Sequence, residues 1–322
     1  MGFLPTTVKE MKALGWDYVD IILFTGDAYI DHPSFGAAVV SRLFEAEGYR
    51  VAVVPQPNWR DDLRDFKKLG RPRLCFCVSA GAMDSMVNHY TAGGAAGFRP
   101  DYTVTTYTKI LKSLFPDTPV LIGGIEASLR RVTHYDYWKN TLMPSILIDS
   151  GADFLLYGMG EQVVREVAKS MHSGFNPKRI SGIRQVAFVA DEEYVERLDR
   201  NKTIFLNSFE RCKADKHAFG QNFVTIETES NLLRAENILV EPTGDKFVVI
   251  NPMNAALTTE QIDYAFDLPY MRAPHPSYNG RGDIPAWMVI RLSVNIHRGC
   301  FGGFSFCTIS ARQGKFISSR SE

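Results

Sequence analysis

The sequence predicts an α/β protein built on a doubly wound, parallel β-sheet. Short apolar runs alternate with amphipathic stretches along the first half of the chain, which is the order of elements in βαβ units. The apolar runs are continuous, as expected for strands that are buried on both faces of a sheet. Hydrophobic residues make up 45% and charged residues 22% of the 322 residues. Such a chain can bury a full core.

Five strands and three crossover helices are expected within residues 1–190. The predicted strands are YVDIILF at 18–24, RVAVV at 50–54, RLCFCVSA at 73–80, PVLIGG at 119–124 and ADFLLYG at 152–158. The predicted helices, in which apolar residues recur every three or four positions, cover 34–49, 99–115 and 160–174. Ligands of such sheets bind at the carboxyl ends of the strands. The loops that follow the strands are 25–36, 79–85, 123–128 and 158–162.

Residues 191–285 are predicted to form a bridging α+β segment, and residues 286–322 a third part. The expected elements are a strand at 184–190, a helix near 204–220, strands at 236–242 and 246–252, and a helix at 258–266. Four prolines between residues 267 and 286 predict irregular structure there. A new strand is expected at 288–296.

The composition argues against several classes of partner. Lys and Arg number 36, as do Asp and Glu, so the chain lacks the positive balance that nucleic acids or anionic membranes attract. No apolar run approaches the ~20 residues that span a bilayer, and the amino terminus lacks a signal-peptide core. The five cysteines are too few, and odd in number, for a secreted disulfide framework. A cytoplasmic, reducing location is therefore expected.

A distinctive motif lies near the end of the sequence, NIHRGCFGGFSFCTIS at residues 295–310. Cys300 and Cys307 flank a glycine-rich loop, with an aromatic residue immediately before the second cysteine. This arrangement resembles the cluster loop of the radical SAM superfamily, whose pattern is C-x-x-x-C-x-aromatic-C. The matching positions here are Cys300, Phe304, Phe306 and Cys307.

Motifs elsewhere in the chain narrow the resemblance to the YgiQ-type radical SAM proteins, and the likeness covers essentially all 322 residues. They include RPDYTVTTY, VLIGGIEASLRRVTHYDYW, SILIDSGADFLLYGMGE, DLPYMRAPHPSY and QGKFISSRS. The resemblance implies a cobalamin-binding-like domain followed by a radical SAM (β/α) barrel, of which residues 286–322 would supply the first strand and the cluster loop. Only 15 residues follow Cys307, so the later barrel strands are expected to be missing.

The resemblance also implies a chemistry. Three thiolates would hold a [4Fe-4S] cluster whose fourth iron binds S-adenosylmethionine. Reductive cleavage would give methionine and a 5'-deoxyadenosyl radical that acts on an unknown small-molecule substrate, with an electron donor such as flavodoxin or ferredoxin. Cys300 and Cys307 would be iron ligands and Phe306 an adenine contact, and no acid, base or nucleophile is assigned.

Phe304 departs from the pattern, because it occupies the middle ligand position and phenylalanine has no lone pair to give to iron. A cube held by two thiolates should be unstable, so the chain is predicted to be inactive as written. His297 could substitute, but a strand-end histidine bonded to backbone is favoured. The alternative hypothesis is a stand-alone module that binds a small molecule or a partner and keeps a relic of the cysteine motif.

Other candidate residues have structural explanations that are favoured. Cys75 and Cys77 alternate along a buried strand, which indicates core packing. His32 suggests a cobalamin ligand, because cobalamin domains often carry the motif Asp-x-His-x-x-Gly. Here Asp31 directly precedes His32 and the glycine is Gly36, so the spacing does not match the motif. Cobalamin is therefore considered unlikely, and a loop that closes the domain onto the barrel is favoured.

The remaining polar and glycine-rich stretches are also expected to be structural. The glycines at 123–124 and 158–161 could let backbone approach a ligand, but tight strand-to-helix turns are favoured. Glu161 is expected to complement a helix dipole in preference to acting as a base. The basic segment 60–73 and the mixed segment 130–140 are interpreted as packed or solvated helix faces.

Overall fold

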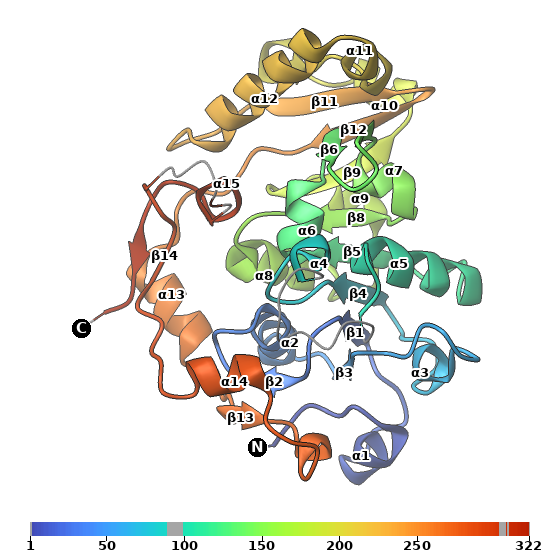
Figure 1. The fold of residues 1–322 in the computed structure, drawn as a ribbon, viewed down its shortest axis with the longest axis vertical. Helices are drawn as coiled ribbons and strands as arrows, with labels where there is room; N and C mark the ends of the chain where they lie inside the picture. The colour runs from blue at the N-terminus through green and yellow to red at the C-terminus, as the bar shows by residue number, and fades with distance from the viewer. Residues whose placement is uncertain (1, 89–98, 303–306, 308, 322) are drawn as a thin grey trace.

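The computed structural model describes residues 2–88, 99–302, 307 and 309–321. The main sheet contains β1 (Ile21–Thr25), β3 (Val51–Pro55), β4 (Cys75–Ser79), β5 (Val120–Gly123), β8 (Phe154–Leu156), β9 (Val186–Ala190), β10 (Thr203–Phe205), β11 (Ile238–Thr243) and β12 (Lys246–Ile250). Within the described residues these nine strands are ordered β10-β11-β12-β9-β8-β5-β4-β1-β3 (Figure 1). Strands β3, β1, β4, β5 and β8 are parallel, whereas β9 and β12 join by antiparallel pairing.

The helices are α1 (Val8–Ala13), α2 (Gly36–Ala46), α3 (Arg64–Lys67), α4 (Ser85–Asn88), α5 (Thr103–Leu114), α6 (Gly124–Leu129), α7 (Ile146–Ser150), α8 (Gly160–Ser170), α9 (Pro177–Ile180), α10 (Glu192–Glu196), α11 (Phe209–Ala214), α12 (Lys216–Ser230), α13 (Thr259–Phe266), α14 (Pro285–Ile290) and α15 (Ile309–Gln313). Two 3₁₀ turns are η1 (Arg200–Lys202) and η2 (Pro276–Tyr278). Short strands pair as β2 (Ile30–Asp31) with β13 (Ala273–Pro274), β6 (His134–Asp136) with β7 (Thr141–Met143), and β14 (His297–Arg298) with β15 (Ser318–Ser319).

Helices cover both faces of the parallel part of the sheet. All five residues of β1 are buried, and successive side chains point to opposite faces. Ile21 and Leu23 pack in one core with residues of α2 and α8, whereas Ile22 and Phe24 pack in a second core with residues of α3, α5 and α7. Burial on both faces explains why the strands are continuous apolar runs. The predicted α/β fold with a mostly parallel sheet is confirmed.

The sheet extends beyond the region in which it was predicted. Strands β10, β11 and β12 continue it past residue 190, and β11 pairs with β12 antiparallel as a hairpin. The expected strands at 184–190, 236–242 and 246–252 and the expected helix at 258–266 are all present as β9, β11, β12 and α13. The division of the chain at residue 190 stays a prediction, and the sheet runs across it.

Two of the predicted elements are wrong. The helix expected near 204–220 is instead β10 followed by α11 and α12, because the Asp215 side chain accepts a hydrogen bond from the His217 amide and starts a new helix. The strand expected at 288–296 is instead α14 and an irregular stretch, since Pro285 stands at a favoured first helical position. The stretch 267–286 is mostly irregular, as expected, but contains β13 and η2.

The segment 130–140 runs from the residue that caps α6 through β6 to the turn before β7, so its interpretation as a helix face is wrong. A buried carboxyl group ties this hairpin to the sheet. Glu241 of β11 is fully buried, and its Oε2 accepts a hydrogen bond from the Thr133 amide at 2.8 Å. Burial raises the pKa of Glu241 to about 7.

The described residues from α13 onward lie along one side of the α/β domain (Figure 1). Helix α13 packs against α2 and α8, and β13 pairs with β2 near the start of the chain. Asp31 of β2 is fully buried, forms an ion pair with Arg42 of α2, and accepts a hydrogen bond from the Met271 amide at 2.9 Å. Among the described residues, no helix has both the length and the apolar character needed to cross a bilayer.

Candidate functional site

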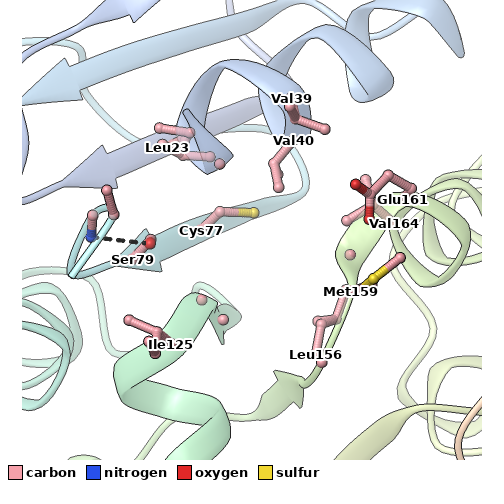
Figure 2. A pocket seen from close by; sticks show the side chains of 18 of the residues that line it. Leu23, Val39, Val40, Cys77, Ser79, Ile125, Leu156, Met159, Glu161 and Val164 are labelled. Carbon is pink, nitrogen blue, oxygen red and sulfur yellow. Dashed lines mark hydrogen bonds between the residues drawn. The ribbon is translucent and has the colours of Figure 1, made fainter. Parts of the chain in front are cut away.

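A cavity of about 320 Å³ lies at the carboxyl ends of β1, β4, β5 and β8. Figure 2 shows Leu23, Val40, Cys77 and Leu156 lining it, with Glu161 of α8 near its edge. The loops that follow the strands contribute these lining residues: Ser34 and Gly36; Ser79, Gly81 and Ala82; Gly123 to Ile125; and Gly158 to Glu161. A cavity therefore lies where the ligand crevice was predicted, at the carboxyl ends of the strands, and its binding of a ligand stays a prediction.

The glycine at the start of α6 is needed for both conformation and space. Gly124 has a φ of +84°, a region that side-chained residues rarely adopt. A Cβ atom at this position would lie 2.7 Å from the Ser79 hydroxyl oxygen. This glycine thus serves the tight strand-to-helix turn, as expected, and also brings bare backbone to the cavity wall.

Two charged groups hold the loops after β1 and β4 together. Asp27 accepts hydrogen bonds from the Ala82 amide at 2.6 Å and from Arg99 at 3.1 Å. The same Arg99 Nη1 donates to the Ala80 carbonyl oxygen at 2.7 Å. These contacts position the loop that carries Gly81 and Ala82 at the rim of the cavity.

A second buried network lies behind α6. Glu126 is fully buried and accepts hydrogen bonds from the Val104 amide at 2.9 Å and from Ser85. Burial raises the pKa of Glu126, although the nearby Arg130 opposes this rise. Arg130 in turn donates to Asp84 at 2.8 Å. The network joins α4, α5 and α6, which fixes the wall of the cavity formed by α6.

The segment that carries the cysteines forms one wall of the cavity through Arg298, Ile309 and Gln313. Arg298 Nε donates to Glu161 Oε1 at 3.0 Å, and these side chains are 19% and 7% exposed. The Arg298 guanidinium also lies over the Phe266 ring, 5.0 Å from its centre. Glu161 is in the first turn of α8, as predicted, but its ion pair with Arg298 was not predicted.

The backbone around Cys300 is held by residues of the following turn. The Gly299 amide donates to Gln313 Oε1 at 3.1 Å, and the Cys300 amide donates to the Gly314 carbonyl oxygen at 3.1 Å. Gly299 has a φ of +86°, and a Cβ there would overlap the Phe316 carbonyl group. The loop thus starts at a position that requires glycine.

The thiols of Cys300 and Cys307 are free and partly exposed, and the Gly302 amide points toward Cys300 Sγ at 3.4 Å. The other cysteines, Cys75, Cys77 and Cys212, are buried, which confirms the core interpretation of the first two. In the part of the chain that the structure describes, no three His, Cys, Asp or Glu side chains gather as a metal site. Two thiols do not fit the three-thiolate set that a [4Fe-4S] cluster with one open iron requires.

Phe304 and Phe306, the predicted ligand-position and adenine-contact residues, lie outside the described residues. His297 is exposed at the start of the two-residue strand β14, and its hydrogen bonding to backbone stays a prediction. Its backbone pairs with Ser319 of β15.

His32 lies inside the protein between the loop after β1 and α14. Its Nδ1 accepts a hydrogen bond from the Ser34 amide at 3.1 Å, and its ring meets the Trp287 ring edge-on at 5.9 Å between centres. Burial, together with Arg272, lowers the pKa of His32. The loop 25–36 therefore packs against the segment that follows the sheet.

Comparisons with known proteins identify the family. The family model described as Radical SAM N-terminal matches residues 3–293. A UPF0313 protein of Porphyromonas gingivalis is 56% identical over 333 residues, covering 99% of this chain and 52% of that protein. A UPF0313 protein of Bacteroides thetaiotaomicron is 52% identical, covering 99% of this chain and 55% of that protein. The chain spans about half the length of the curated relatives it matches. The predicted radical SAM resemblance is thus confirmed, and the chain belongs to the radical SAM N-terminal family.

Proposed function

We propose that this chain is the amino-terminal part of a radical SAM protein, in which the α/β domain presents a small-molecule cavity beside the cysteine loop. One observation supports this most directly: Arg298, two residues before Cys300, lines the cavity and is paired with Glu161 of α8. The cavity and the cysteine segment are thereby parts of one site. The proposed substrate is a small molecule, and a flavodoxin or ferredoxin is the proposed electron donor for an intact protein of this family.

We further propose that the chain as written does not cleave S-adenosylmethionine. In an intact loop, Cys300, Cys307 and a third cysteine at position 304 would be the iron ligands, and Phe306 would contact adenine. A bound cluster supplies the electron for cleavage of S-adenosylmethionine in this superfamily. With Phe304 in place of the third thiolate, the donor set is one short. Cys75 and Cys212 are buried away from the cavity, and Cys77, which lines it, belongs to a buried strand outside the loop.

Anaerobic reconstitution with iron and sulfide tests this proposal. The protein and its Phe304→Cys variant should be compared by iron and sulfide analysis and by release of 5'-deoxyadenosine from S-adenosylmethionine. The matched control is Phe301→Cys, which adds a thiol to the same loop at an 80% exposed position with the wrong spacing. Cluster loading in Phe304→Cys alone would support the proposal, and a stable four-iron cluster in the unchanged protein would overturn it.

The cavity also favours a second candidate function, a small-molecule-binding module with a relic cysteine motif. The volume of the cavity, about 320 Å³, falls within the range of about 300–1,000 Å³ that is typical of ligand sites. The two functions differ in one measurable respect. The relic hypothesis expects ligand binding without any gain of a stable four-iron cluster when Phe304→Cys restores the third thiol.

A further inference from the structure

We infer that the cavity binds an uncharged, largely apolar molecule of one or two rings that carries a hydrogen-bond acceptor. This inference deepens the proposed function, and it rests on that proposal only for the role of the ligand as the substrate. The cavity itself, its lining and its charge balance are independent of any cluster. The ligand class follows from size, polarity and the available hydrogen-bond donors.

Size limits the ligand to a compact molecule. A volume of about 320 Å³ would hold about ten water molecules at about 30 Å³ each. That volume lies at the lower end of ligand-binding sites. Val40 of α2, Cys77 of β4 and Val164 of α8 face the same space (Figure 2), so branched aliphatic side chains and a thiol form part of its wall. A molecule of one or two rings is of a size that such a volume can hold.

Polarity excludes a strongly charged ligand. The lining is mainly aliphatic, with Leu23, Val39, Val40, Leu121, Ile125 and Leu156 among its members. Its charged residues, Glu161 and Arg298, neutralise each other through their 3.0 Å contact. A ligand charge buried here would have no free counter-charge, and an unpaired buried charge is costly. Apolar groups are therefore stabilised, and net charges are disfavoured.

Hydrogen-bond donors lie at one end of the cavity. Helix α2 starts at Gly36 and helix α8 at Gly160, and both glycines line the cavity. Neither helix has a side chain that caps its first amides. Glu161 already complements the α8 amino terminus, whereas α2 has no acidic residue in its first turn. An acceptor oxygen or nitrogen on the ligand can therefore meet the first amides of α2.

The cysteine segment closes the opposite side. Ile309 and Gln313 line the cavity, and Gln313 accepts the hydrogen bond from the Gly299 amide at 3.1 Å. A bound molecule thus contacts the α/β domain and the residues that hold the start of the cysteine loop. This placement suits a substrate that must lie close to the cysteines.

Protection of Cys77 from alkylation provides a direct test. Cys77 is 7% exposed and faces the cavity, whereas Cys75 on the same strand is fully buried and does not line it. The full chain would be treated with iodoacetamide, with and without 2-naphthol, and the alkylation of each cysteine followed by mass spectrometry. At about ten times its dissociation constant, 2-naphthol should slow Cys77 alkylation about tenfold relative to the ligand-free protein, whereas the fully buried Cys75 should stay unmodified in both.

Two comparisons make this test specific. The anion 2-naphthalenesulfonate, with the same ring system, should protect Cys77 at least tenfold less at equal concentration. Val40→Trp should fill the cavity and abolish protection, whereas Val224→Trp, at a 63% exposed position on α12, should leave it unchanged. If Val40→Trp fails to fold, Gly160→Leu replaces it, since a Cβ at Gly160 would meet only Val164 and Val40, at 3.8 and 4.0 Å.

The inference is overturned if 2-naphthol does not slow the alkylation of Cys77, if 2-naphthol still protects Cys77 in the cavity-filling variants, or if the sulfonate protects Cys77 equally well. The assay contains no iron or S-adenosylmethionine. Its failure is therefore distinct from failure of the reconstitution experiment, which tests the cysteine loop alone.

Discussion

Replacing Glu161 by glutamine should loosen the segment that carries Cys300 and Cys307. Arg298 donates to Glu161 at 3.0 Å, and both side chains are largely buried. Glutamine keeps an acceptor oxygen and almost the same size, so the change removes the charge and little else. The ion pair joins α8 to β14, which also pairs with β15 and whose Arg298 lies over the Phe266 ring. Loss of the charge should therefore act locally on residues 297–302 and 314–320.

The magnitude follows from the kind of hydrogen bond that is lost. A hydrogen bond to a charged group contributes about 1.5–3 kcal/mol, and a neutral one about 0.5–1.5 kcal/mol. The free energy of local opening should fall by the difference, about 1–2 kcal/mol. This corresponds to a rise of about 5- to 30-fold in the population of the open segment.

Amide hydrogen exchange measured by mass spectrometry can detect this change. Peptides within 297–302 and 314–320 should exchange about 5- to 30-fold faster in Glu161→Gln, and peptides of β1 and β4 should not change. Asp267→Asn is the matched control, because Asp267 pairs with Arg320 of the same segment but is 64% exposed. Such surface pairs contribute at most about 1 kcal/mol. Equal exchange in Glu161→Gln and the unchanged protein would refute the reasoning.

Two further predictions concern buried charges. Asp31→Ala should lower the free energy of unfolding by about 3 kcal/mol in urea titrations, because the buried Arg42 keeps only the partly exposed Glu45 as an ionic partner, beside the Gly2 carbonyl oxygen. A loss below about 1 kcal/mol would contradict this. The second prediction concerns Glu241. The free energy of unfolding should fall as pH rises from about 4.5 to about 7, because the Glu241 carboxyl group loses its proton at lower pH in the unfolded chain than in the folded chain. The fall should be on the order of 3 kcal/mol, and it should be absent in Glu241→Gln when urea titrations at pH 5 and pH 8 are compared; an equal fall in both proteins would argue against this assignment.

Local patterns predicted the parallel part of the sheet well. Residues 21–25 and 75–79 are apolar runs buried on both faces, and each appears within three residues of its expected bounds. The same pattern failed at 288–296, where the apolar residues are exposed; Val289 is 82% and Leu292 is 90% exposed. An apolar run becomes a strand only where neighbouring strands supply hydrogen bonds and cover, which the run itself does not encode.

The site was predicted in part. Its position followed from the general location of crevices in parallel sheets, and the loops after β4, β5 and β8 do meet there. The pairing of Glu161 with Arg298 could not be predicted, because the two residues are 137 positions apart and neither lies in a charge pattern that indicates a partner. The sequence shows that Arg298 lies two residues before Cys300, but only the structure shows that Arg298 also lines the cavity.

Iron content after anaerobic reconstitution tests the central claim, that position 304 decides whether the cysteine loop of this radical SAM family member can hold a cluster. The unchanged protein should retain far less than one four-iron cluster per chain after desalting, whereas Phe304→Cys should approach one, and Phe301→Cys should resemble the unchanged protein. A stable four-iron cluster in the protein with Phe304 present, or no gain in Phe304→Cys, would contradict the claim.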